Sequence, residues 1–137
     1  MIREHYAAVR AMVPAGTQVY AWSVPSPPVY PYVCFWGDLG EESSGGPDGD
    51  SLSDVPDLLT LRIRATYAGV TGDAVSEVAR KVRAALNRKT PAVAGWAPSP
   101  LRQSVLNDAQ TDFSVTIPNV GNPVFAVDEF ALVSERL

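Results

Sequence analysis

The sequence contains one cysteine, Cys34, and one histidine, His5, among its 137 residues. A single cysteine cannot form an internal disulfide, and one cysteine with one histidine cannot supply the ligands of a zinc site. Cys34 lies in an apolar run, which predicts a buried thiol in a reducing compartment. Glycine-rich nucleotide-binding motifs and the serine elbow motif are also missing. We therefore expect no metal and no cofactor.

Basic residues are fewer than acidic ones, 11 against 15, and the formal net charge is -4. Because proteins that bind nucleic acid rely on clustered Lys and Arg, this excess of acidic residues argues against a nucleic-acid binder. No apolar stretch approaches the roughly 18 residues that span a membrane. The charged N-terminal residues also lack the pattern of a secretory signal. We expect a protein without a membrane segment that is made in the cytoplasm.

A hydrophobic share of 46% and a charged share of 19% are typical of a globular chain. The length then predicts a single domain over residues 1–137. Residues 37–57 differ from the rest, since they hold seven of the fifteen acids, several Gly, Ser and Pro, and no basic residue. Such a segment repels itself and has little to bury, so we expect a flexible acidic loop at 37–57.

Apolar side chains at helical spacing predict helices over residues 2–13 and 73–87. His5 falls on the solvent side, or at the edge, of the apolar stripe of the first helix. Asp73 is placed to cap the second helix, and basic residues gather toward that helix's C-terminal end. Both helices have one apolar face, so we expect them to pack against a sheet.

Clean alternation of apolar and polar residues predicts a strand over 58–67. The prolines between residues 25 and 31 indicate an extended connection rather than a central strand. Other strands are expected from Tyr30 or Tyr32 to Trp36, and at 101–106, 112–117 and 124–133. The last changes phase near Asp128 and Glu129, which predicts a bulge or an edge position. The expected fold class is α+β, a mainly antiparallel sheet of four to five strands packed against two helices.

Gly49 to Ser53 spell the nucleophile block of a class of serine esterases. A serine nucleophile needs a base within hydrogen-bond reach, and these esterases take it from a histidine near the C-terminus. The chain has no histidine after His5, and Ser51 is surrounded by loop residues. The spaced acids around Ser51 also lack the ligand pattern of a calcium-binding loop. We interpret the stretch as loop and expect no catalytic residue.

Two groups of basic residues are candidates for contacts. Arg62 and Arg64 are two residues apart on one face of the strand at 58–67, where they pair with carboxylates of a neighbour or face water. Arg80, Lys81 and Arg83 lie close together on the helix at 73–87. Neither group belongs to a recognised catalytic motif.

The order of elements resembles the tail terminator (tail completion) family of long-tailed bacteriophages over nearly the whole chain. The resemblance is carried by the strand Leu58–Tyr67 running into the helix Asp73–Asn87, and by the late strands around 112–117 and 124–133. It implies a small α+β domain without catalytic residues. Six copies would form a ring on the head-proximal end of the tail tube, stop tube growth and offer a docking surface to the head connector.

The resemblance also implies a location in the virion and particular partners, which are other copies of the chain, the tube protein and the head connector or stopper protein. DNA would pass through the ring without specific binding, and an acidic lumen suits such a conduit. The loop acids, Asp48, Asp50 and Asp54 among them, would line the lumen or reach the basic residues Arg80, Lys81 and Arg83 of an adjacent copy.

Three other interpretations stay open at this point. The first is another head–tail joining protein, a connector or stopper subunit. The second is a small esterase that uses Ser51, and the third is a cellular α+β adaptor without a role in a virion. Gene neighbours that encode a tape measure and a tube protein would separate the adaptor from the others.

Overall fold

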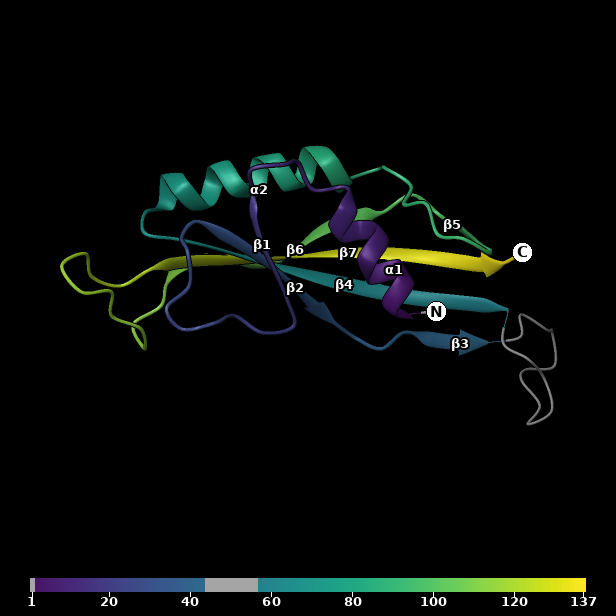
Figure 1. Ribbon diagram of the computed structural model, residues 1–137, viewed down its shortest axis with the longest axis horizontal. Coiled ribbons are helices and arrows are strands. Elements are labelled where there is room, and N and C mark those ends of the chain that lie inside the picture. Colours follow the sequence, from purple (N-terminus) through teal and green to yellow (C-terminus); the bar gives the residue numbers. More distant parts are fainter. Residues whose placement is uncertain (1, 44–56) are drawn as a thin grey trace.

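The computed structural model describes residues 2–43 and 57–137 (Figure 1). Two helices and seven strands make up these residues. The helices are α1 (Ile2–Ala11) and α2 (Gly72–Leu86). The strands are β1 (Gln18–Ala21), β2 (Tyr32–Gly37), β3 (Glu41–Ser43), β4 (Leu58–Gly69), β5 (Trp96–Pro98), β6 (Arg102–Thr111) and β7 (Val124–Arg136). The expected α+β class with a mainly antiparallel sheet is confirmed.

All seven strands belong to one sheet, in the order β1-β2-β4-β7-β5. The long strands β4 and β7 form its centre and pair antiparallel from Leu58↔Glu135 to Gly69↔Val124. β3 pairs with the start of β4, and β6 pairs with β7 beside β5. Of the strand pairs in residues 2–43 and 57–137, only β1–β2 is parallel. The three short strands β1, β3 and β5, which have little hydrophobic pattern of their own, raise the strand number above the expected four to five.

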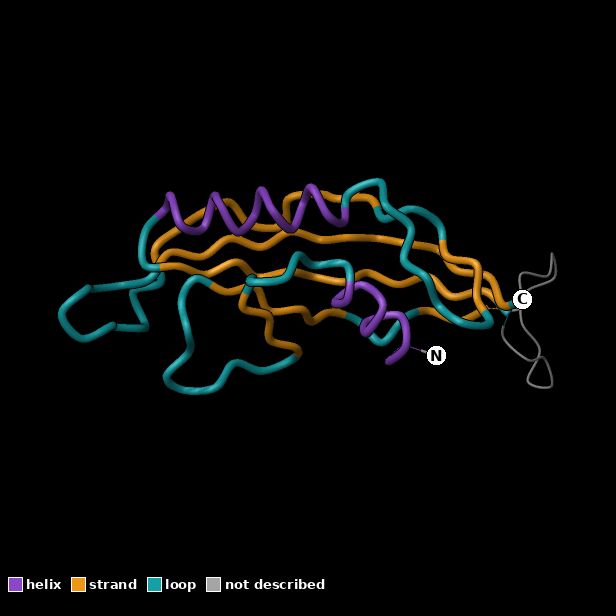
Figure 2. The backbone as a smooth tube through the Cα atoms, turned by 45° about the horizontal axis from the view of Figure 1, so that its top comes forward, coloured by secondary structure: helices purple, strands orange, loops and turns teal. Residues whose placement is uncertain are grey.

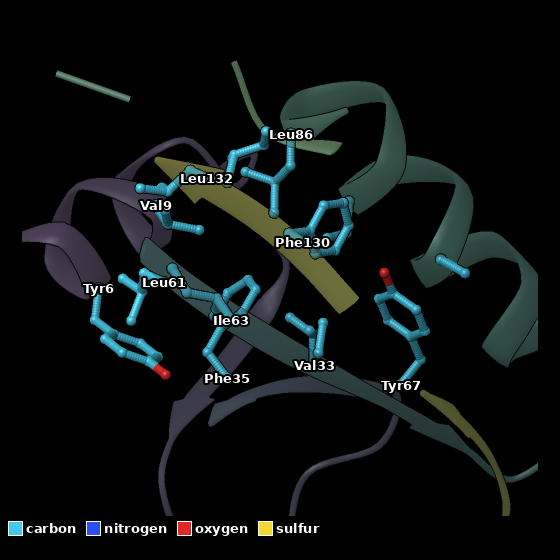
Figure 3. Close-up of a cluster of buried hydrophobic side chains, with 14 of the residues drawn as sticks. Tyr6, Val9, Val33, Phe35, Leu61, Ile63, Tyr67, Leu86, Phe130 and Leu132 are labelled. Atoms are coloured by element: carbon cyan, nitrogen blue, oxygen red, sulfur yellow. The ribbon is translucent and has the colours of Figure 1, made fainter. Parts of the chain in front are cut away.

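The alternation in β4 sets the position of the core. Its predicted inward residues are all buried, namely Leu59, Leu61, Ile63, Ala65 and Tyr67. Val33 and Phe35 of β2 and Phe130 and Leu132 of β7 join them in one cluster (Figure 3). Fully burying an aliphatic or aromatic side chain of this size contributes roughly 1.5–3 kcal/mol. The cluster therefore supplies most of the stabilisation of the domain.

α2 covers this face along β4, β6 and β7, as Figures 1 and 2 show. It begins after Thr71, whose hydroxyl oxygen accepts a hydrogen bond of 3.1 Å from the backbone N–H of Ala74. The expected cap, Asp73, lies instead in the first turn, where its charge favours the positive end of the helix dipole. Thr71 is the N-cap because its backbone is extended and it directly precedes the first helical residue, whereas Asp73 is already inside the helix.

α1 covers the same face near the C-terminal end of β7. The expectation that His5 faces solvent is wrong, because its side chain is fully buried. The Nε2 atom of His5 lies 2.8 Å from the hydroxyl oxygen of Ser134, and the ring meets the edge of Trp96 at 5.2 Å. The hydrogen bond to Ser134 offsets the free-energy cost of burying the imidazole. His5 therefore belongs to the buried face of α1.

Two strand expectations are corrected. Residues 112–117 are not a strand but a loop with a turn at Phe113 and Ser114. The Asp112 carboxylate accepts a hydrogen bond of 3.0 Å from the backbone N–H of Ser114, which competes with strand pairing. β7 is a central strand with unbroken register to β4, so the expected edge position is wrong, and the irregularity near Asp128 occurs in its pairing with β6. The register shifts lie in its partner β6, between Val105 and Asn107 and again before Gln110.

Most of the predicted acidic loop at 37–57 lies outside the described residues. Of its described part, Gly37 ends β2, and Glu41–Ser43 pair with the start of β4 as β3. Gly37 adopts a φ of +150°, and a Cβ there would lie 2.5 Å from the carbonyl oxygen of Arg62. Only glycine fits this close approach between β2 and β4. The flexibility of the loop stays a prediction.

Candidate assembly surfaces

Arg62 and Arg64 lie on the sheet face that faces away from both helices. Both approach Glu129 of β7, with Nε to carboxylate oxygen distances of 3.8 Å from Arg62 and 3.4 Å from Arg64. The guanidinium of Arg64 also lies 5.2 Å from the ring centre of Trp36. The structure therefore pairs both arginines with a carboxylate of their own chain. Exposed pairs of this kind contribute about 0–1 kcal/mol, so this cluster adds little to stability.

The three basic residues of α2 have different environments. Arg80 pairs with Glu77 on the exposed side of the helix at 2.6 Å, and Lys81 is also exposed. Arg83 points instead toward the sheet and binds Asp128 of β7. Arg80 and Lys81 lie on the exposed side of α2, with Arg80 paired to Glu77, whereas Arg83 is bound to a buried carboxylate.

Asp128 is a carboxylate buried in the core, with 1% of its surface exposed. Arg83 donates two hydrogen bonds to it, of 2.6 and 2.8 Å, one to each carboxylate oxygen. The Tyr67 hydroxyl donates a third of 2.8 Å, and the Gln103 amide a fourth of 3.3 Å. Burial, followed by the charge of Asp128, raises the pKa of Tyr67 well above its usual value, so the phenol stays a donor. This cluster joins α2, β4, β6 and β7.

The sequence contains a signal for this cluster. The inward positions of β7 read Ala126, Asp128, Phe130 and Leu132, so an acid stands where the alternation requires an apolar residue. The apparent change of phase marks a buried, partnered carboxylate. A buried acid needs a cation, and Arg83 of the facing helix supplies it.

An arm, which we define as residues 105–123, carries the outer part of β6 and the turn into β7. Residues 105–111 are paired with β7 in the sheet, and the loop that follows β6 projects at one end of the molecule (Figure 1). The turn is closed by the Ile117–Gly121 bridge, and the Asn122 amide donates a hydrogen bond of 2.6 Å to the carbonyl of Val115. Its apolar side chains are nevertheless exposed, namely Val105, Leu106, Phe113, Val115 and Val120. Phe113 has 82% of its surface exposed, and such a group of apolar side chains is typical of a contact surface.

The base of the arm lies beside the sheet. Asp112 and Val115 of the arm and Tyr30 and Tyr32 of the chain line one cavity of about 150 Å³. Burial is the main cause that raises the pKa of Tyr32 to about 12, and the carboxylate of Asp112 adds to it. The arm leaves the sheet where the β6–β7 pairing ends at Thr111↔Val124, and Phe113 is exposed directly beyond that point.

A groove of about 540 Å³ lies between α1, the end of β1 and β2. Its lining is mostly apolar, and its residues are Ile2, Arg3, Tyr6, Ala7, Arg10, Ala21, Trp22, Phe35 and Leu39. Trp22 adopts a φ of 68° and packs on Tyr6 with ring centres 4.8 Å apart. Half of the Trp22 surface remains exposed, as does most of Leu39. The groove thus has the aromatic rings of Trp22 and Tyr6 on one side and the exposed Leu39 side chain at its edge.

The esterase interpretation gains no support from His5. Its imidazole is buried against Ser134 and Trp96, so it offers no base at the surface. Ser51 lies outside the described residues, as do Asp48, Asp50 and Asp54, and the contacts expected of those acids stay predictions. Among the described residues, no group of three His, Cys, Asp or Glu side chains could hold a metal ion. No helix in that part of the chain is long and apolar enough to cross a membrane.

The comparisons with known proteins find similarity among solved structures and not among family models or curated sequences. No family model matches the chain, and no curated protein matches it in sequence. Among solved structures, a chain in the virion of a native gene transfer agent (GTA) particle superimposes with a TM-score of 0.58. The match covers 98% of this chain and 94% of the other at 14% sequence identity. The two chains therefore share a fold over nearly their whole length.

Proposed function

We propose that the protein is a structural component of a virion. In this proposal, six copies form a ring that caps the tail tube, ends tube growth and provides the docking surface for the head. The observation that carries it is the end-to-end fold likeness to a chain of a gene transfer agent virion. The order of elements resembles the tail terminator family independently of that likeness.

The surface of the chain supports an assembly role. A ring of identical chains needs two different patches on each copy, because one patch must meet the other on the next copy. The arm and the groove are two such patches, both rich in exposed apolar side chains. A net charge of -4 also suits a ring through which DNA passes without being bound.

The test is electron microscopy of particles made after the gene is disrupted in its source genome. A terminator role predicts headless tails of excess or irregular length, and supplying the intact gene in trans should restore normal particles. Filled heads beside detached tails of normal length would favour a connector or stopper. Infectious particles of normal form would contradict a virion role altogether.

A further inference from the structure

The exposed apolar side chains of the arm and the apolar lining of the groove complement each other. Phe113 projects at the arm with 82% of its surface in solvent. The groove, at about 540 Å³, is in the size range that encloses a small ligand, so it has room for an aromatic ring. Aromatic rings also prefer tilted or edge contacts with other rings, and Trp22 and Tyr6 offer such a wall.

The charges of the two surfaces have opposite sign. The arm contains two acids, Asp108 and Asp112, and no Lys or Arg. Of the residues that line the groove, only Arg3 and Arg10 are charged. Both arginines are exposed on α1, at the margin of the apolar lining. The negative charge of the arm is therefore complementary to the positive charge at the margin of the groove.

The arm does not reach the groove of its own chain. Its tip projects at one end of the long axis, while α1 lies in the other half of the molecule beside the N-terminus (Figures 1 and 2). The arm is attached to the sheet through the pairing of β6 with β7, which extends to Thr111↔Val124. Any contact between the arm and the groove therefore joins two copies of the chain.

We propose that the arm of one copy inserts Phe113 into the groove of the next copy, which makes a head-to-tail contact. Repetition of one such contact between two different patches closes a ring when the rotation per copy divides a full turn. This inference rests on the proposed ring and names the residues that build it.

Disulfide trapping in assembled particles tests the contact. The buried Cys34 is first replaced (Cys34→Ala), and Phe113→Cys is then combined with Ala7→Cys, an exposed residue of the groove. Particles from the source genome that carry this chain are oxidised mildly and run on a non-reducing gel. We expect a ladder of multiples that ends at the ring, with most of the chain shifted from the monomer position.

Matched variants serve as controls. Phe113→Cys with Ala84→Cys on the exposed side of α2 should stay monomeric, as should each single cysteine variant. Phe113→Asp should reduce incorporation into particles at least tenfold. Leu137→Asp changes a side chain that is equally exposed, 85% against 82%, and should leave incorporation unchanged.

The outcomes separate the contact from the ring. If the chain is present in particles, shows no ladder and tolerates Phe113→Asp, the arm–groove contact is wrong while the proposed function stands. A cross-link from position 7 to a different virion protein would also overturn the contact. If the wild-type chain is absent from particles, the proposed function itself fails.

Discussion

The sheet face under the helices buries its side chains, whereas the arm and the groove leave apolar side chains exposed. Under the helices, Asp128 and His5 are fully buried and each has a partner inside the chain. Among the described residues, no buried side-chain nitrogen or oxygen lacks a hydrogen-bond partner. On the arm, Phe113 and its apolar neighbours are left in solvent. The first region explains how one chain folds, and the second carries the proposed contact with another copy.

Two phenylalanines give the largest expected contrast. Phe130→Ala removes a fully buried ring from the core and should lower the free energy of unfolding by about 4 kcal/mol. Phe113→Ala changes an exposed ring of the arm and should alter it by less than about 0.5 kcal/mol. Urea denaturation followed by circular dichroism measures both. Equal losses would show that the arm is part of the folding core.

Two arginines of α2 sharpen the same contrast with a smaller effect. Arg83→Ala leaves Asp128 buried without its cation and should lower the free energy of unfolding by about 2 kcal/mol. We take a value below that of a fully buried pair because 41% of the Arg83 side chain is exposed. Arg80→Ala removes only a surface pair with Glu77 and should leave the urea midpoint unchanged. A silent Arg83→Ala variant would contradict the role assigned to the cluster.

The pH dependence of the free energy of unfolding tests the role of the Tyr67 hydroxyl, which donates a hydrogen bond to Asp128. The folded chain holds the pKa of Tyr67 above its usual value near 10, because of burial and the charge of Asp128. The folded state therefore keeps a proton that the unfolded state loses, and stability falls as pH rises above about 10. The loss from Tyr67 should reach at most about 1.4 kcal/mol for the first pH unit.

Urea midpoints at pH 9 and pH 11 measure this loss. Tyr67→Phe should make the fall shallower without abolishing it, because Tyr32, whose pKa is raised to about 12, contributes in the same direction. A Tyr67→Phe variant that falls as steeply as the wild type would contradict the assignment.

The smallest effect is expected on the other face of the sheet. Glu129→Gln removes both pairs with Arg62 and Arg64 and should change the free energy of unfolding by about 0.5 kcal/mol. The difference from the wild type should shrink in about 1 M salt, because salt screens exposed charges. A larger effect that is independent of salt would mean that this cluster acts as a buried pair.

The body of the fold could be predicted because its patterns are local. The alternation of β4 and the spacing of α2 each specify one buried face, and both faces are as expected. The strands β1 and β3 have four and three residues, too few for a pattern, and exist because β2 and β4 pair with them. Such pairing depends on distant segments, so the sequence alone does not reveal it.

The assembly surfaces were harder to predict. The turn at Asp112 and Ser114 looks like a strand by hydrophobicity, and the side chain to backbone hydrogen bond that prevents the strand is visible only in the structure. The groove depends on how α1 meets β1 and β2, which no local pattern specifies. Among the basic residues, sequence spacing grouped Arg83 with Arg80, whereas the buried Asp128 separates their roles.

The central claim is that this chain forms a ring at the head-proximal end of a tail, with its arm in contact with the next copy. A cryo-electron microscopy reconstruction of the junction between head and tail, in particles from the source genome, tests it most directly. The account predicts a closed ring of this fold between the tube and the connector, with Phe113 of each copy in the groove of its neighbour. A junction without this chain would contradict the account.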